Sequence, residues 1–185
     1  MKLSRLALLS LVFLLVLPFG CARKKADLPE APAGYSWYTA KNGAGSYLVP
    51  KGWYTKEDSD KVENTLYITR EKITKKTGFS AGLTVKQIAK ASSKVGFSPS
   101  FYAQQYIAKL VAASRTIRSG VVQGPTPMHV ARVYGEKDGI RTIAHHSAIG
   151  LDDKDAVYLI SFEAPENEWQ ALEPTAREIN QFLLE

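Results

Sequence analysis

The sequence contains little of what disulfide bonds, membrane spans and nucleic-acid contacts require. A single cysteine stands among 185 residues, so no disulfide bond can form within the chain. No apolar run reaches the about 20 residues that a helix needs to cross a bilayer; the longest, residues 6–17, is apolar except for Ser10. The net charge of +6 is spread along the chain and does not form the clustered basic face that favours nucleic-acid binding. Stability must therefore come from an apolar core, which a chain of this length can build.

The position of the one cysteine predicts how the chain is attached in the cell. Lys2 and Arg5 precede the apolar run and Gly20 follows it, which is the layout of a secretory signal peptide. The Gly20-Cys21 step resembles the lipobox of bacterial lipoproteins, in which a diacylglyceryl group is added to the cysteine and a peptidase cuts just before it. The resemblance implies a signal peptide over residues 1–20 and a membrane anchor through the lipid on Cys21.

Two alternatives stay open at this end of the chain. One is an uncleaved anchor with a buried, inert Cys21, which the basic residues 23–25 favour because positive charge beyond an apolar run opposes translocation. The other is a simple cleaved signal peptide. In the lipoprotein interpretation, Ala22 stands where an aspartate would, by resemblance to enterobacterial lipoproteins, favour the inner membrane. We therefore expect a protein of the bacterial cell envelope that faces the periplasm, with the outer membrane favoured.

The remainder of the chain divides into a tether and one domain. Residues 21–34 have two prolines and no hydrophobic period, which is typical of a flexible tether. Residues 35–185 show no internal repeat and no low-complexity tract, so we expect one globular domain. Removal of residues 1–20 takes away two basic residues and no acid, which leaves a net charge of +4. Strand-like patterns begin the domain at residues 36–40, 46–49, 62–70 and 80–89.

A helix and a meander are predicted next. Ser98 suits the cap of a helix and Pro99 its first position. The apolar stripe of this helix contains Ala103, Tyr106, Ile107, Leu110 and Ser114. Alternation then predicts a three-stranded antiparallel meander over residues 128–134, 140–149 and 155–163. Both rows of the last strand are mostly apolar, so we expect it to lie at the centre of the sheet, covered on both faces.

The chain is expected to close with an amphipathic helix. Pro174 should separate this helix from a short helical turn at residues 169–172, because proline is costly inside a helix. The side chains that the helix should bury are Ala176, Ile179, Phe182 and Leu183.

The order of these elements resembles the PsbP-like family. The resemblance rests on "YLVPKGW" at residues 47–53, the helix in the middle of the chain, "DAVYLISFEAP" at residues 155–165 and the closing helix. The family includes the PsbP subunit of photosystem II, a nuclear Ran-binding protein and bacterial DcrB-like lipoproteins. It implies an α+β fold in which helices sandwich an antiparallel sheet (α/β/α layers), and a non-enzymatic domain that docks on another macromolecule. It implies no catalytic residue and no cofactor.

The alternative function is a periplasmic hydrolase or a metal-dependent enzyme. His145 and His146 are neighbours in a strand and point to opposite faces, so they cannot chelate one ion together. His129 and His146 would share a face if the connection between their strands has an even length, and two imidazoles are half of a zinc site. We expect ordinary sheet histidines, because no further ligands are visible in the sequence.

Three other polar groups are candidate sites. Ser147, either neighbouring histidine and Asp152 could form a Ser-His-Asp set, but no nucleophile elbow supports it. Asp152, Asp153 and Asp155 could bind calcium, although a polar hairpin turn explains them better. The basic residues 70–76 fit a solvated loop or, as the alternative, a contact with anionic lipid headgroups. The sequence thus predicts a lipid-anchored binding or assembly factor with a protein partner, no nucleic acid and no identified small-molecule substrate.

Overall fold

The computed structural model describes residues 28–74 and 78–183, so the predicted signal peptide and Cys21 lie outside the described residues. The main sheet has seven strands, and every neighbouring pair is antiparallel. In spatial order the strands are β3 (Tyr54–Ser59), β4 (Asn64–Thr69), β5 (Gly82–Ala89), β9 (Ala156–Pro165), β8 (Ile140–Leu151), β7 (Met128–Lys137) and β6 (Thr116–Val122).

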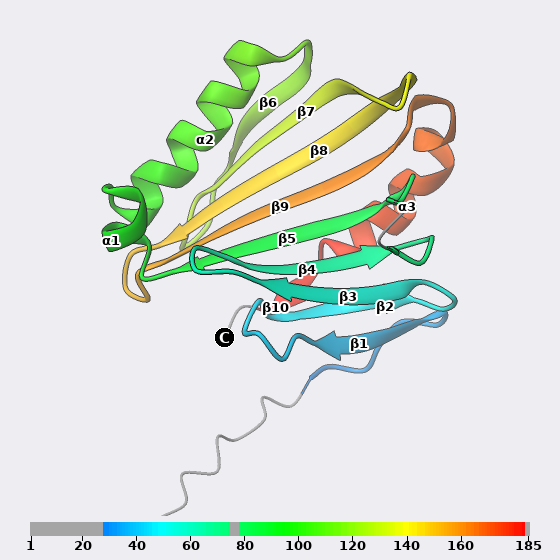
Figure 1. Cartoon of the computed structure of the whole chain (residues 1–185), viewed down its shortest axis with the longest axis horizontal. Coiled ribbons are helices and arrows are strands. Elements are labelled where there is room, and N and C mark those ends of the chain that lie inside the picture. The colour runs from blue at the N-terminus through cyan, green and yellow to red at the C-terminus, as the bar shows by residue number, and fades with distance from the viewer. Residues whose placement is uncertain (1–27, 75–77, 184–185) are drawn as a thin grey trace, which may run out of the picture.

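Helices and a small second sheet cover the two faces of the main sheet. The small sheet has the order β1 (Tyr35–Thr39), β2 (Ser46–Pro50) and β10 (Phe182–Leu183). Figure 1 views the main sheet from the side of α2, which packs against β7, β8 and β9, while α3 lies behind the sheet. The helical segments are α1 (Ala91–Val95), α2 (Pro99–Ala113), the 3-10 turn η1 (Glu166–Glu168) and α3 (Trp169–Ile179). The predicted α+β class, an antiparallel sheet between helices, is confirmed.

Strand β9 joins two apolar layers, as its sequence predicted. Tyr158, Ile160 and Phe162 point toward the layer that contains α3 and β2, and they are at most 1% exposed. Val157 and Leu159 point the other way and pack under α2. A strand that is buried on both faces is apolar at successive positions, which is why simple alternation fails there.

The closing segment differs from the prediction in two respects. Helix α3 continues through Pro174 as one helix, so no break separates residues 169–172 from the rest. The proline removes one hydrogen bond of the helix, but Trp169, Ala176 and Ile179 bury the helix against the core and hold it. The helix ends at Ile179, and Phe182 belongs to β10, which pairs with β2, and not to the helical stripe.

The turn between β8 and β9 fixes the position of both helices on the α2 side. The Asp152 carboxylate accepts hydrogen bonds from the backbone N–H and the hydroxyl of Ser100 at 2.8 and 2.7 Å. The Asp155 carboxylate accepts the corresponding pair from Ser92 at 2.8 and 2.6 Å. Gly150 lies so close to the first turn of α2 that an added Cβ would be 2.2 Å from its backbone. The carboxylates of Asp152 and Asp155 in this turn therefore hold the starts of α2 and α1 in place, as polar side chains in a turn can.

The start of α2 confirms its predicted cap. The Ser98 hydroxyl accepts a hydrogen bond from the N–H of Phe101 at 3.4 Å, and Pro99 occupies the first helical position.

Of the expected tether, the structure describes residues 28–34, and the Trp37 indole donates a 2.7 Å hydrogen bond to the Pro29 carbonyl. Within the described ranges, no helix combines the length and apolar character needed to cross a membrane.

Candidate functional site

The three histidines lie on the meander as the sequence predicted. His146 pairs in register with Ala131, two residues after His129, so His129 and His146 share the α2 face of the sheet. His145 pairs with Arg132 and points to the opposite face. Among residues 28–74 and 78–183, no group of three or more His, Cys, Asp or Glu side chains is arranged to hold a metal ion.

The residues of the possible Ser-His-Asp set are used separately. Ser147 is 4% exposed inside the sheet, and it lies on the same face as His145. The Asp152 carboxylate is engaged by Ser100 at the end of the hairpin. The structure therefore gives these three groups different neighbours and does not assemble a nucleophile with its base.

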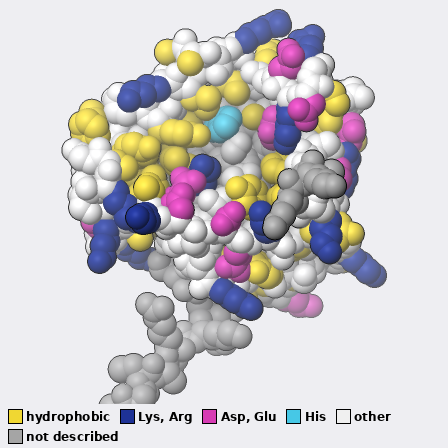
Figure 2. Space-filling view, in the orientation of Figure 1, with side chains coloured by type: hydrophobic (Ala, Val, Ile, Leu, Met, Phe, Trp, Pro, Cys, Tyr) yellow, Lys and Arg dark blue, Asp and Glu magenta, His cyan; other side chains and the backbone are white. Residues whose placement is uncertain are grey.

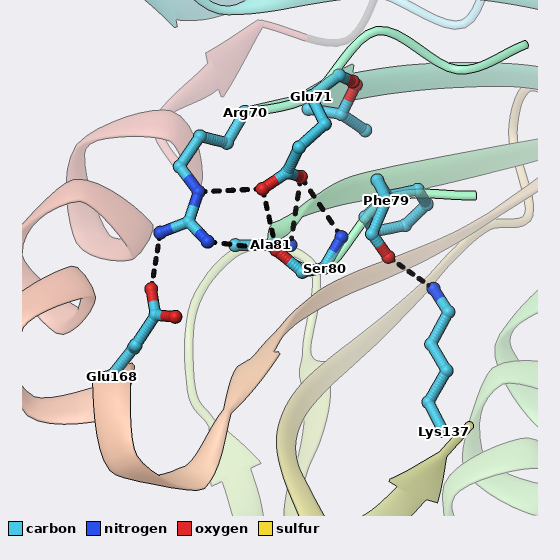
Figure 3. A network of polar contacts seen from close by, with 8 residues as sticks. Arg70, Glu71, Phe79, Ser80, Ala81, Lys137 and Glu168 are labelled. Atoms are coloured by element: carbon cyan, nitrogen blue, oxygen red, sulfur yellow. Dashed lines mark hydrogen bonds and ion pairs between the residues drawn. The ribbon is translucent and has the colours of Figure 1, made fainter. Parts of the chain in front are cut away.

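A dense polar network surrounds the loop that follows β4 (Figure 3). Arg70 donates to the Glu71 carboxylate at 2.8 Å and to the Ser80 hydroxyl at 2.9 Å, and it also pairs with Glu168 in η1. Glu71 accepts hydrogen bonds from the Ser80 hydroxyl at 2.6 Å and from the Ser80 backbone N–H at 3.0 Å. The network joins the end of β4, the start of β5 and the entrance to α3, so its polar groups satisfy one another.

The charge state of Glu71 follows from these bonds. Burial alone would raise the pKa of this carboxyl, but the hydrogen bonds from Ser80, Arg70 and the backbone lower the pKa to about 2. The hydrogen bonds that Arg70 donates to the carboxylates of Glu168 and Glu71 raise the pKa of Arg70 above its usual value. Arg70, the first residue of the basic segment 70–76, is therefore neutralised inside the fold. Lys75 and Lys76 lie outside the described residues.

A pocket of about 570 Å³ adjoins this network. Its lining includes Glu71, Phe79 and Lys137. Lys137 donates a 2.6 Å hydrogen bond to the Phe79 carbonyl, and its ammonium lies 4.2 Å from the centre of the Phe79 ring (Figure 3). Lys137 is thus held by the Phe79 carbonyl and ring, which is a structural use of its charge.

A row of apolar and aromatic side chains lies along one side of α2. We call this row the α2 flank and define it as Phe97, Phe101, Tyr102, Tyr106 and Leu110. It borders a groove of about 490 Å³ that Gln105 and Lys109 also line. Figure 2 looks onto the α2 side of the molecule and shows apolar side chains gathered where α2 lies.

Two members of the α2 flank are large and face solvent. Phe97 is 54% and Phe101 is 43% exposed, and their ring centres lie 5.3 Å apart in a tilted pair. Water-exposed phenylalanines that stack on each other present a contiguous apolar patch, and such patches mark contact sites for other molecules. Their exposure is therefore the feature of α2 that core packing does not explain.

The inner edge of the groove carries no net charge at neutral pH. The Tyr106 ring meets the His146 ring edge-on, with their centres 6.5 Å apart. Burial lowers the pKa of His146, so the imidazole is neutral, and burial raises the pKa of Tyr106. Lys86, which lies near Tyr106, is paired with Glu63 at 2.6 Å. Apart from Lys109, uncharged side chains line the groove, so it is suited to an apolar or aromatic group.

A signal for the α2 flank was present in the sequence. The buried stripe of α2 passes through Pro99, Ala103 and Ile107, and Phe101 lies two residues from the stripe, on another side of the helix. An aromatic residue off the apolar stripe is a candidate for a surface contact. Tyr158 and Trp169, by contrast, are buried in the core.

Comparison with known proteins establishes the fold alone. Neither a protein-family model nor a curated protein sequence matches the chain significantly. A crystal structure from Bacteroides thetaiotaomicron is similar with a TM-score of 0.54 and 11% identity; the match covers 82% of this chain and 49% of that one. The chain thus spans about half the length of that protein.

Two smaller proteins match over nearly their whole length. The solution structure of cyanobacterial PsbP (CyanoP) from Synechocystis has a TM-score of 0.52 and 12% identity, with 84% of this chain and 95% of that chain covered. The Ran-binding protein Mog1p from Saccharomyces cerevisiae has a TM-score of 0.50 and 12% identity, with 81% and 95% covered. The domain therefore has a PsbP/Mog1-like fold, as the sequence resemblance implied.

Proposed function

We propose that this chain is a non-enzymatic binding or assembly factor of the bacterial cell envelope. It is anchored to a membrane by lipid on Cys21, faces the periplasm and holds another envelope protein through its folded domain. The observation that carries the binding role is the α2 flank, where the exposed, stacked Phe97 and Phe101 border an apolar groove. Aromatic residues of this kind are enriched where proteins contact each other.

Two further observations support a binding role over a catalytic one. The polar groups that the sequence offered for catalysis are engaged separately, with Asp152 bound to Ser100 and Ser147 buried in the sheet. Enzyme sites bring such groups together in one cleft. A protein of related fold, yeast Mog1p, is a Ran-binding protein, which is a function of the same kind.

The membrane anchor follows from the sequence around Cys21. The Gly20-Cys21 step and the short apolar run before it fit a lipoprotein signal peptide, and the proline-containing residues 21–34 supply the tether. With an anchor of this kind, the domain meets its partner at the membrane, where both are concentrated.

The test replaces the exposed aromatic pair while it leaves the core intact. The double variant Phe97→Ser/Phe101→Ser should unfold within about 1 kcal/mol of wild type, because both side chains face water. When membranes are dissolved in mild detergent, wild type should migrate as a complex larger than the monomer, and the variant should migrate as the monomer. Ile140→Ser, which alters a residue that is 54% exposed at another place, is the matched control and should keep the complex. An unchanged complex in the double variant would contradict the proposal.

A further inference from the structure

The two edge strands of the main sheet are protected to different degrees. Strand β3 carries the charged residues Lys56, Glu57 and Asp58, and the turn between β1 and β2 closes over it. The Asn42 side chain donates to the Asp58 carbonyl at 3.2 Å, and the Glu57 carboxylate accepts from the backbone of Asn42 at 2.9 Å. Charges and a covering loop are the usual means by which an edge is kept from pairing with another chain.

Strand β6 lies at the opposite edge, and within the described part of the chain no strand pairs with its outer side (Figure 1). All of its residues after Thr116 are exposed, and Ile117, Val121 and Val122 are apolar side chains that are 41–49% exposed. The strand has one partner, β7, on its inner side. The unpaired backbone N–H and C=O groups of an edge strand are a template for one more strand.

A shallow groove of about 410 Å³ lies beside β6 on the sheet face opposite α2. Arg118 from β6, Arg132 from β7 and His145 from β8 line it in successive strands. Burial, and then the two arginines, lower the pKa of His145 to about 4, so this ring is neutral and the groove owes its positive charge to the guanidinium groups.

The positive charge of this groove is not balanced within the described part of the chain. Glu173 accepts from Arg132 at 2.9 Å and from Arg177 at 3.5 Å, so one carboxylate serves two guanidinium groups. No carboxylate among the described residues forms an ion pair with Arg118. Arg118 and Arg132 also stand directly opposite each other in the β6–β7 register, and like charges in that position destabilise a sheet.

Gly120 leaves room at the centre of the groove. A Cβ added to Gly120 would lie on the same face of the sheet as the Arg118 side chain, and it would meet nothing within 4 Å. A strand placed outside β6 would set alternate side chains over this space, between the charged Arg118 and the apolar Val122. An acidic side chain there would bring a carboxylate to the two arginines that face each other.

We propose that β6 binds an extended acidic segment of a partner protein by strand addition, with acidic side chains of that segment at Arg118 and Arg132. This inference goes beyond the proposed function, since it concerns a second surface on the other face of the sheet and depends on neither the α2 flank nor the lipid anchor. The backbone of β6 supplies the pairing, and the arginines select the charge of the added strand.

The experiment uses two synthetic peptides of the length of β6, which alternate threonine or valine with glutamate in one peptide and with lysine in the other. Binding to the folded protein is followed by NMR shifts of backbone amides. The glutamate peptide should shift the amides of β6 and β7, and the lysine peptide should not. Arg118→Glu should weaken binding of the glutamate peptide by about tenfold and should favour the lysine peptide. Lys61→Glu makes the same charge change between β3 and β4, at the opposite edge of the sheet, and should leave the binding unaltered.

A pair of proline variants tests the role of the backbone. Successive residues of an edge strand direct their N–H groups alternately inward and outward, so Ser119→Pro and Gly120→Pro remove one group of each kind. The variant that keeps the wild-type unfolding transition is the one that has lost the outward group, and it should no longer bind the glutamate peptide.

Four results would overturn the inference. They are equal binding of the two peptides, binding that survives Arg118→Glu, binding that survives in the folded proline variant, and shifts confined to α2. Binding of anionic phosphatidylglycerol vesicles that Arg118→Glu abolishes, without peptide binding, would assign the groove to a lipid surface instead. Concentration-dependent dimerisation that the proline variant abolishes, again without peptide binding, would assign β6 to a second copy of this chain. If the double variant Phe97→Ser/Phe101→Ser kept its complex, so that the proposed function failed, the expected results for β6 would stay the same.

Discussion

Gly150→Ala is the single substitution that tests most sharply how α2 is held on the sheet. The added Cβ would lie 2.2 Å from the carbonyl carbon and oxygen of Pro99 and 2.3 Å from the backbone nitrogen of Ser100. These atoms belong to the helix backbone and cannot rotate away as a flexible side chain could. The first turn of α2 must therefore move outward by about 1 Å or more, since real contacts of a Cβ are longer than about 3 Å.

The cost has two parts. Forcing an extra methyl group into a packed site costs about 1–3 kcal/mol. The movement also stretches the hydrogen bonds from Ser100 to the Asp152 carboxylate, now 2.8 and 2.7 Å, and loss of such bonds at an exposed site costs about 1 kcal/mol. We expect a loss of about 3 kcal/mol in the free energy of unfolding, which corresponds to a melting temperature about 6–12 °C lower for a domain of this size.

The assay is urea unfolding of the purified domain, followed by tryptophan fluorescence. Gly120→Ala is the matched control, because its Cβ meets nothing within 4 Å, and it should change the free energy of unfolding by less than about 0.5 kcal/mol. A Gly150→Ala protein as stable as this control would refute the close approach of α2 to β8, and with it the placement of the α2 flank.

Three further substitutions test other parts of the structure. Ile179→Ala should cost about 2–5 kcal/mol of unfolding free energy, because Ile179 is fully buried where α3 meets the core; a loss below about 0.5 kcal/mol would show that α3 is not part of it. Glu71→Gln should lower the stability at pH 7 by about 1–2 kcal/mol, a value discounted because Glu71 is 39% exposed. The pKa of Glu71 is about 2 in the folded state against an ordinary 4.5, so its contribution is complete above pH 4.5 and is lost as the pH falls toward 2. Stability curves of wild type and variant should therefore converge over that range, and parallel curves would contradict the network. Cys21→Ser should leave the protein uncleaved or outside the detergent phase, whereas normal membrane retention with cleavage elsewhere would exclude the lipoprotein anchor.

The meander and α2 could be predicted from sequence because local signals and tertiary packing agree there. Ser98 and Pro99 mark a helix start whatever surrounds them, and the alternation of β7 and β8 matches a sheet covered on each face by different layers. Strands β3 and β6 were missed for the opposite reason. "YTKEDS" and "TIRSGVV" have weak apolar alternation, because an edge strand pairs on one side and buries little.

The closing segment shows where local rules yield to packing. Pro174 predicts a break, yet α3 continues through it, because Trp169 and Ile179 on either side are buried in the core. Phe182 fits a helical period, but its backbone finds a pairing partner in β2, and no pattern near Phe182 announces a partner more than a hundred residues earlier in the chain. The local pattern at Phe182 thus favours a helix, and only the tertiary structure places it in a strand.

The candidate site could be predicted in part. The sequence placed His145 and His146 on opposite faces and Asp152 in a hairpin turn, and both predictions are confirmed. The exposure of Phe97 and the open edge at β6 depend on which surfaces α1 and the neighbouring strands leave uncovered. Exposure of that kind arises from the assembled fold, so periodicity in the sequence does not report it.

The most direct test of the binding role is photo-crosslinking in intact cells. A photoreactive phenylalanine analogue is placed at Phe101 on the α2 flank in the full anchored chain, and at Tyr54 on β3 as a control that is similarly exposed, 47% against 43%. After irradiation, the Phe101 position should yield a discrete adduct with one envelope protein, and the Tyr54 position should not yield that adduct. No adduct at Phe101, or the same adducts at both positions, would contradict the proposal that the α2 flank holds a specific partner.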